Sequence, residues 1–166
     1  NDMLFACMLG NTASLVQKTD KGAFDTIGDK TDGALLLYAK HHNPAIQDEI
    51  KTGKFVDEHV FDASSKMITT VWEKNDKKHV FVRGAPEAIL TASILSTHEE
   101  QQIRTAYESF AKEGLRVIAF GKKIDNDAHR RNRQELEQGL HFVGIVGIYD
   151  PPRPEAQQAI RQAKSA

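Results

Sequence analysis

Three short runs rich in β-branched and aromatic residues lie close together in the middle of the chain and constrain its fold most strongly. The runs are residues 55–61, 66–73 and 78–83, and the polar clusters between them are residues 62–65 and 74–77. Runs of this kind are typical of β-strands, and short polar clusters are typical of turns. The sequence therefore predicts a three-stranded antiparallel meander. The alternation from Met67 to Trp72 further predicts one buried and one solvent-exposed face.

The segments on either side of the meander predict helices and two further strands. We expect helices over residues 2–9, 32–39, 86–90, 98–112 and 155–164, and strands over residues 115–120 and 140–148. Thr31 and Asp32 are capping-type residues at the start of the second helix, and Asn43-Pro44 can open another short one. Residues 11–28 and 126–138 are polar and predict an irregular loop and a surface loop or exposed helix. The chain is thus expected to form one α/β domain, a mostly antiparallel twisted sheet flanked by helices.

Composition and charge exclude several functional classes. The chain has 166 residues and a formal net charge of −1, with no block of five or more like charges. This balance argues against a nucleic-acid-binding stripe or a polybasic membrane surface. Cys7 is the only cysteine, so an intrachain disulfide is impossible. The near-apolar run over residues 140–149 is too short to cross a bilayer, and Asn1-Asp2 supplies no positive region of a secretory signal.

Two common site motifs fail on spacing. Residues 22–31, GAFDTIGDKT, approach the phosphate-binding P-loop, but five residues separate Gly22 from Gly28, and Asp29 stands where the motif needs Lys. The adjacent pair His41-His42 points to different sides of a helix, and no His-x3-His or Cys-x2-Cys spacing occurs, so no metal site is expected. The basic cluster of Arg130, Arg131 and Arg133 is interpreted as a solvated loop.

Three other segments together contain the side chains that a nucleotide requires. Phe61 ends one predicted strand, and Lys66 follows it across a turn. Arg83 precedes Gly84 and Ala85, which have almost no side chain. Taken alone, each residue is explained by packing, solvation or a plain turn. Taken together, an aromatic face can stack on a base, residues without bulk allow a flat ring to approach, and cations neutralise phosphate.

Five sequence stretches carry a resemblance to a known family. They are GDKTDGALL at residues 28–36, FDASSKM at 61–67, RGAPE at 83–87, GLRV at 114–117 and DPPR at 150–153. In this order and at these intervals, the chain resembles the nucleotide-binding (N) domain of type II P-type cation-transporting ATPases, the calcium, sodium/potassium and related pumps. The resemblance extends over residues 1–153, and the short domain without large inserts is similar to that of bacterial calcium-type pumps.

The resemblance implies an ATP site and gives each residue a role. The implied set is Thr31, Asp32, Phe61, Lys66, Met67, Arg83, Gly84, Ala85 and Arg116. Phe61 would stack on adenine, Lys66 would contact the nucleotide in the same pocket, and Asp32 would meet the polar edge of adenine with Thr31 beside it. Gly84 and Ala85 would form the pocket wall, and Arg116 would hold the phosphate end.

Three positions depart from the family's pattern. The family usually has Glu where Asp32 stands, and the shorter side chain favours a water-mediated contact with adenine. It usually has Lys where Arg83 stands, and a planar guanidinium should give a different phosphate geometry. Ala63 replaces a residue that is often polar and removes one possible contact. ATP binding is still expected.

The resemblance also implies that the aspartate that accepts the phosphate lies in another domain. The family's phosphorylated Asp lies in an Asp-Lys-Thr-Gly-Thr string, but here Asp29-Lys30-Thr31 is followed by Asp32. Residues 1–153 are therefore expected to bind ATP without productive hydrolysis, and residues 154–166 to form a helical extension towards the phosphorylation domain. Hinges are expected near Asn1 and residues 150–153.

The remaining expectations concern the setting of the chain. Magnesium is expected to be needed by the parent pump and not bound by this chain alone. The expected partners are ATP and the phosphorylation and actuator domains of the same chain, with no nucleic acid. The resemblance implies a soluble, monomeric cytoplasmic domain of an integral membrane protein. The alternatives are a protein-interaction or regulatory module that has lost nucleotide binding and a stand-alone kinase or phosphatase.

Overall fold

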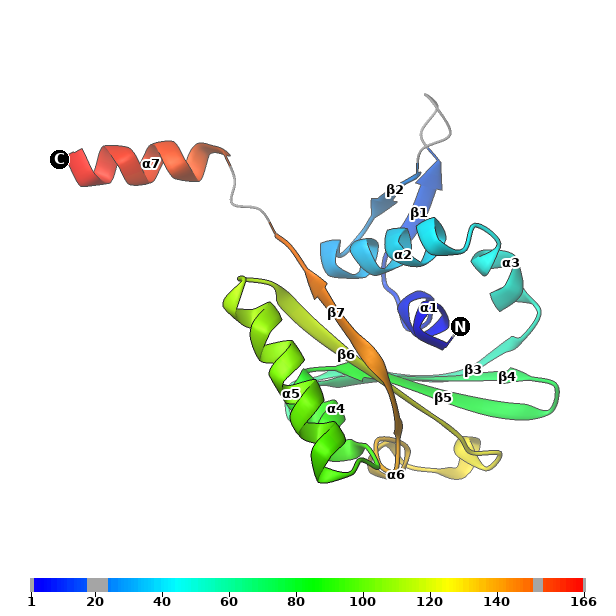
Figure 1. Ribbon diagram of the computed structural model, residues 1–166. Coiled ribbons are helices and arrows are strands. Elements are labelled where there is room, and N and C mark those ends of the chain that lie inside the picture. Colours follow the sequence, from blue (N-terminus) through cyan, green and yellow to red (C-terminus); the bar gives the residue numbers. More distant parts are fainter. Residues whose placement is uncertain (1, 18–23, 151–153, 166) are drawn as a thin grey trace.

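A five-stranded antiparallel sheet forms the centre of the molecule (Figure 1). The computed structural model describes residues 2–17, 24–150 and 154–165. The strands follow one another in chain order across the sheet: β3 (Lys54–Asp62), β4 (Met67–Lys74), β5 (Lys77–Gly84), β6 (Arg116–Ile124) and β7 (His141–Ile148). The predicted meander and the two further strands are therefore confirmed.

The turn between β4 and β5 follows from its two central residues. Lys74 pairs with Lys77, so only Asn75 and Asp76 connect the strands. Both have positive φ, 52° and 57°, as a two-residue hairpin turn of the primed type requires. Asn and Asp accept this left-handed conformation more readily than other residues with a side chain. The polar cluster at residues 74–77 thus forms the turn that the sequence predicts.

Helices cover both faces of the sheet (Figure 1). One face packs against α1 (Asp2–Met8), α2 (Lys30–His42) and α3 (Ile46–Lys51), through a core that includes Trp72, Phe81 and Phe120. The other face packs against α4 (Pro86–Ala92), α5 (Thr97–Lys112) and α6 (Arg133–Leu136), through a core that includes Val71 and Val80. The prediction of an α/β domain with a flanked antiparallel sheet is confirmed.

The prediction that β4 has a solvent-exposed face is wrong. Val71 lies in the core on the α4–α6 side, whereas its neighbour Trp72 lies in the core on the α1–α3 side. Thr69 and Thr70 are buried as well. The alternation along the strand separates side chains between two cores, because helices that precede β3 cover one face of the sheet and helices between β5 and β7 cover the other.

The region before α2 is more ordered than its composition indicates. The predicted loop over residues 11–28 contains β1 (Ser14–Gln17) and β2 (Phe24–Ile27), which pair as a small antiparallel sheet, and its residues 18–23 lie outside the described residues. Asp29 caps α2, because its side chain accepts hydrogen bonds from the backbone N–H groups of Thr31 and Asp32. These two residues form the first turn of the helix and are not its caps.

The polar segment over residues 126–138 is only partly exposed. It forms a short 3-10 helix, η1 (Ala128–Arg130), followed by α6. Ala128 and Leu136 are buried in the core on the α4–α6 side, so this segment closes one end of that core. The interpretation of its arginines as a solvated loop is wrong for Arg133, which bonds to a buried carboxylate and to two backbone carbonyls.

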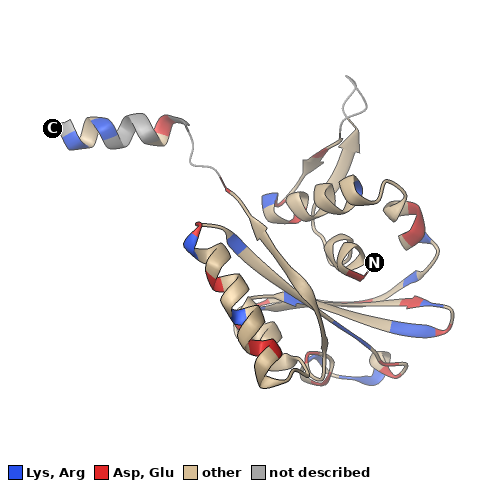
Figure 2. Cartoon of the chain, in the orientation of Figure 1, with Lys and Arg blue, Asp and Glu red and all other residues tan. Residues whose placement is uncertain are grey.

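The last helix, α7 (Pro154–Ser165), stands apart from the sheet in Figure 1. The hinge prediction refers to the chain near Asn1 and residues 150–153, and apart from Asp150 these residues lie outside the described residues. In the parts of the chain that the structure describes, no helix has both the length and the apolar character that a membrane crossing requires. Figure 2 shows Lys and Arg interspersed with Asp and Glu over the described elements.

We expect Phe120, in the core on the α1–α3 side of the sheet, to be critical for stability. Its side chain is fully buried, so Phe120→Ala should lower the free energy of unfolding by about 3–5 kcal/mol through lost burial and an unfilled cavity. Phe55, which is 56% exposed on β3, provides the matched control, and Phe55→Ala should cost less than about 1 kcal/mol. Urea unfolding followed by circular dichroism measures both. Similar losses for the two variants would contradict the proposed location of the core.

Candidate functional site

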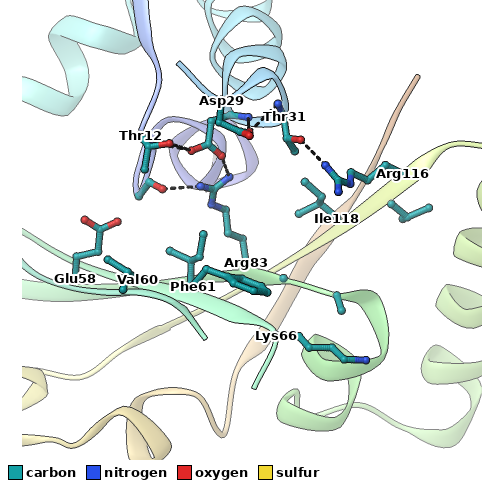
Figure 3. A pocket seen from close by; sticks show the side chains of 16 residues that line it. Thr12, Asp29, Thr31, Glu58, Val60, Phe61, Lys66, Arg83, Arg116 and Ile118 are labelled. Carbon is teal, nitrogen blue, oxygen red and sulfur yellow. Dashed lines mark hydrogen bonds and ion pairs between the residues drawn. The ribbon is translucent and has the colours of Figure 1, made fainter. Parts of the chain in front are cut away.

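A cavity of about 720 Å³ opens where the start of α2 meets the ends of four sheet strands (Figure 3). Its wall also includes Gly10 and Thr12, which follow α1. The sheet contributes residues of β3, β4, β5 and β6, so segments distant in the sequence converge on one space. The volume lies in the range of small-molecule sites.

The structure brings most of the predicted site residues together in this cavity. Its lining includes Thr31, Asp32, Phe61, Lys66, Arg83, Gly84, Ala85 and Arg116. Met67 is the exception, because its side chain is buried in the core on the opposite, α4–α6 side of the sheet and lines two other hollows there. The contact of each residue with a ligand remains a prediction.

The hairpin between β3 and β4 carries Phe61 and Lys66. The Asp62 carboxylate accepts hydrogen bonds from the backbone N–H of Ser64 at 2.8 Å, from that of Ser65 at 3.0 Å, and from the Ser64 hydroxyl. These bonds lower the pKa of Asp62 to about 2. The turn is therefore held internally, while Phe61 is 61% exposed at the rim of the cavity.

Gly84 and Ala85 form a wall where β5 passes close to the start of β4. The Ala85 N–H donates to the Lys66 carbonyl oxygen at 3.2 Å. A Cβ on Gly84 would collide with the same oxygen and crowd the Cα of Met67, so this position requires glycine. Pro86 then begins α4, as the sequence predicts for the turn after the strand.

A buried ion pair between Asp32 and Arg83 forms the floor of the cavity (Figure 3). The Asp32 Oδ1 lies 2.8 Å from the Arg83 Nη1, and its Oδ2 accepts from the Thr12 N–H at 2.8 Å and from the Thr12 hydroxyl at 2.9 Å. Arg83 also donates to the Gly10 carbonyl at 2.5 Å. Both carboxylate oxygens are thus engaged within the protein, and the charge of Arg83 is compensated.

Opposing effects set the protonation of Asp32. Burial acts to raise the pKa of this carboxyl group, but the hydrogen bonds and charge of Arg83 and the bonds from Thr12 outweigh it. The pKa of Asp32 is therefore lower than its ordinary value of 3.8. Asp32 is ionised at neutral pH, which a closely paired guanidinium makes possible in a buried site.

Two exposed cations remain at the cavity with weaker partners. The Arg116 Nη1 donates to the Thr31 hydroxyl at 2.7 Å, which links the start of β6 to the first turn of α2. The Lys66 ammonium lies 3.0 Å from the Glu87 carboxylate, with both side chains more than half exposed. Exposed pairs of this kind contribute little to stability, so these cations can exchange their partners for a ligand at small cost.

Several lining residues were not predicted from the sequence. They are Gly10, Thr12, Asp29, Glu58, Val60, Ile68, Val117 and Ile118. Ile68 of β4 pairs with the predicted Arg83 of β5, so both side chains lie on the same face of the sheet. The register of these two strands is the signal that could have indicated Ile68. Thr12 gave no signal, since it precedes β1 in a segment interpreted as irregular. In the described ranges, no group of three or more His, Cys, Asp and Glu side chains could hold a metal ion.

We expect the buried ion pair to make stability depend on pH. Because the pKa of Asp32 is lower in the folded chain, its contribution is complete above pH 3.8 and is lost as the pH falls through the folded value. Asp32→Asn should cost about 3–5 kcal/mol at pH 6, since Arg83 is left buried without a counter-charge. The difference from the unaltered chain should shrink by pH 3. Urea unfolding at both values measures it, and an equal difference at both would contradict this assignment.

Comparison with known proteins identifies the family. Residues 1–155 match the family described as P-type ATPase, cytoplasmic domain N. The chain is 34% identical to the sodium/potassium exporting P-type ATPase cta3 of Schizosaccharomyces pombe, over 95% of this chain and 16% of that protein. It is 28% identical to the calcium-transporting ATPase of Bacillus subtilis, over 99% of this chain and 19% of that protein.

A third relative, the probable cation-transporting P-type ATPase of Mycoplasma genitalium, is 33% identical over 99% of this chain and 18% of its own length. The chain therefore spans less than a fifth of the length of these relatives. The matches confirm the family that the ordered motifs indicated, whereas the calcium-type assignment stays a prediction. Since the family match covers nearly the whole sequence, the chain belongs to the P-type ATPase cytoplasmic N domains.

Proposed function

We propose that the chain binds ATP in the cavity between α2 and the sheet, and presents the γ-phosphate to an aspartate in another domain of the same pump. The observation that carries the proposal is Phe61, a large aromatic side chain left 61% exposed beside a wall without bulk. A stacked adenine would cover this apolar surface, and base–aromatic stacking is worth about 1–3 kcal/mol.

The residues around Phe61 fit the base end of a nucleotide. Gly84 and Ala85 carry little or no side chain, so a flat ring can approach the backbone. Val60, Ile68 and Ile118 add apolar surface to the lining. Since Asp32 is already bonded to Arg83 and Thr12, its predicted contact with adenine would add to these bonds or act through water.

The phosphate end is assigned to the two exposed cations. Arg116 can offer a planar pair of donors, and Lys66 a flexible point charge, to phosphate oxygens. Arg83 faces the cavity, but its charge is already balanced by Asp32, so it contributes less to phosphate neutralisation than its position in the sequence implied. Because only these two exposed cations are left to neutralise the phosphates, we expect weak ATP binding that does not require magnesium in this chain.

The names of the relatives allow the proposal to be extended from this chain to the intact protein. Their names describe cation-transporting, calcium-transporting and sodium/potassium exporting ATPases. We infer that the chain serves a cation-transporting P-type ATPase. ATP supplies the transferable phosphoryl group, and the sequence holds no Asp-Lys-Thr-Gly-Thr string to accept it. Closure of this domain onto a phosphorylation domain would then deliver the phosphate.

Phe61→Ala tests the base end. Loss of the stacking surface should weaken ATP binding about 5- to 100-fold, because 1.4 kcal/mol corresponds to a factor of ten. Titration of the ¹⁵N-labelled chain with ATP in EDTA measures the affinity, and the amide signals of Phe61, Lys66, Gly84 and Arg116 should shift. Phe55→Ala, on the same strand but outside the cavity lining, should leave the affinity within about twofold. Unshifted signals at millimolar ATP would exclude the proposed site.

Arg116→Met tests the phosphate end separately. Removal of the guanidinium should weaken ATP binding about 3- to 20-fold through lost charge-assisted hydrogen bonds, and should leave adenosine binding unchanged within about twofold. The same titration with ATP and with adenosine measures both affinities. Arg130→Met, an exposed arginine away from the cavity, controls for the change in net charge. Equal losses for ATP and adenosine would place Arg116 at the base instead.

A further inference from the structure

We propose that Arg133, on the opposite side of the sheet from the cavity, is a positioning residue that holds Phe61 and Lys66 in place for the nucleotide. This inference rests on the proposed function. Arg133 belongs to α6, which contributes to the core on the α4–α6 side, whereas the cavity lies on the side of α1 and α2. It therefore does not line the ATP cavity and acts on it through the backbone.

The guanidinium of Arg133 spans the base of the hairpin that carries both residues. Its Nη1 donates to the Val60 carbonyl at 2.9 Å, and its Nη2 donates to the Met67 carbonyl at 2.6 Å. Val60 directly precedes Phe61, and Met67 directly follows Lys66. One side chain thus fixes the backbone at both ends of the segment that enters the cavity rim.

The pairing of the sheet is irregular at this point. The pairing of β3 with β4 shifts register between His59 and Asp62, so the regular ladder is interrupted beside Val60 and Phe61. A bulge of this kind leaves backbone groups without strand partners. The hydrogen bond from Arg133 satisfies the Val60 carbonyl there, and it supplies a link between the two strands that the ladder does not provide.

A buried carboxylate fixes the orientation of Arg133. The Glu137 Oε1 accepts from the Arg133 Nε at 2.8 Å and from the Thr69 hydroxyl of β4 at 2.8 Å. Glu137 is 5% exposed, so the carboxylate depends on these partners for its charge and hydrogen bonds. Arg133 bonds through all three guanidinium nitrogens in one planar fork, a geometry that lysine cannot reproduce.

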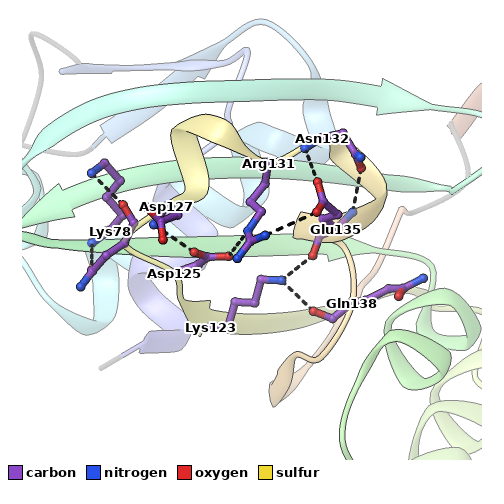
Figure 4. A network of polar contacts seen from close by, with 9 residues as sticks. Lys78, Lys123, Asp125, Asp127, Arg131, Asn132, Glu135 and Gln138 are labelled. Carbon is purple, nitrogen blue, oxygen red and sulfur yellow. Dashed lines mark hydrogen bonds and ion pairs between the residues drawn. The ribbon is translucent and has the colours of Figure 1, made fainter.

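The short helix α6 is itself anchored to the end of β6 (Figure 4). Asn132 and Glu135 form a capping box at its start. Arg131 bonds to the Asp125 carboxylate at 3.3 Å, and the Lys123 ammonium donates to the carbonyls of Glu135 at 2.6 Å and Gln138 at 2.8 Å. A helix of four residues is not stable alone, so these contacts give Arg133 a fixed base.

Loss of this support should reduce the population of binding-competent hairpin. Phe61 is largely exposed and Lys66 makes only an exposed ion pair, so neither side chain holds the hairpin by packing. The apparent dissociation constant rises in proportion as the competent fraction falls. Arg133→Met should therefore weaken ATP binding about 5- to 30-fold, and Arg133→Lys, which retains the charge and one donor position, should weaken it less.

A double-mutant cycle with Phe61→Ala separates positioning from general destabilisation. If Arg133 positions Phe61 and Lys66, Arg133→Met should cause the full loss of affinity in the unaltered chain and a smaller further loss, from Lys66 alone, in the Phe61→Ala background. Titration of each variant with ATP in EDTA gives the four dissociation constants. Arg130→Met is the matched control, because it removes an exposed arginine three positions earlier and should change no affinity.

Each outcome of the cycle decides the proposal. Unchanged affinity in Arg133→Met, or an equal loss with and without Phe61, would overturn it. If Arg133→Met does not fold, Arg133→Lys enters the same cycle and is judged by the same coupling. If the unaltered chain does not bind ATP, or if Phe61→Ala binds as tightly as the unaltered chain, the proposed function fails instead. In that case the amide signals of residues 60–67 without nucleotide still report whether Arg133 orders the hairpin.

Discussion

The buried ion pair between Asp32 and Arg83 connects the parts of the molecule that the cavity needs. Arg83 lies on β5, Asp32 lies in the first turn of α2, and both also bond to the segment after α1, at Gly10 and Thr12. The removal of two charges from water is costly, and these additional hydrogen bonds offset part of that cost. The pair therefore fixes the distance between the helical layer and the sheet, and with it the depth of the cavity.

This arrangement separates a rigid floor from an adaptable rim. Asp32 and Arg83 on the floor are buried and bond to each other and to the segment after α1, whereas Phe61, Lys66 and Arg116 are exposed and make few bonds. A ligand that meets the rim displaces only weak contacts of Lys66 and Arg116. Asp32 and Arg83, where the sequence analysis expects departures from the family's usual residues, both lie on this floor.

The sequence predicted features that depend on short-range pattern. The turn at Asn75 and Asp76 and the strands around it follow from residue types alone, and the ordered motifs indicated half of the residues that line the cavity. The second covered face of the sheet was missed, because alternation does not distinguish a core from solvent when both sides are packed. β1 and β2 were missed because four-residue strands such as Ser14–Gln17 are too short for a clear period. The ion pair of Arg83 with Asp32 could not be predicted, because no local sequence pattern links β5 to α2.

The bulged end of β3 explains how the two faces of one sheet can share a site. Side chains of a strand alternate between faces, so a residue on the α6 side cannot contact a ligand on the α2 side directly. Through its hydrogen bonds to backbone carbonyls, it can act on the part of the chain that carries the ligand-facing side chains. At the register shift the Val60 carbonyl accepts from Arg133 instead, and the next residue, Phe61, lies at the rim of the cavity. Arg133 thus links β3 and β4 where their pairing is irregular, and supports from the opposite face the hairpin that carries Phe61.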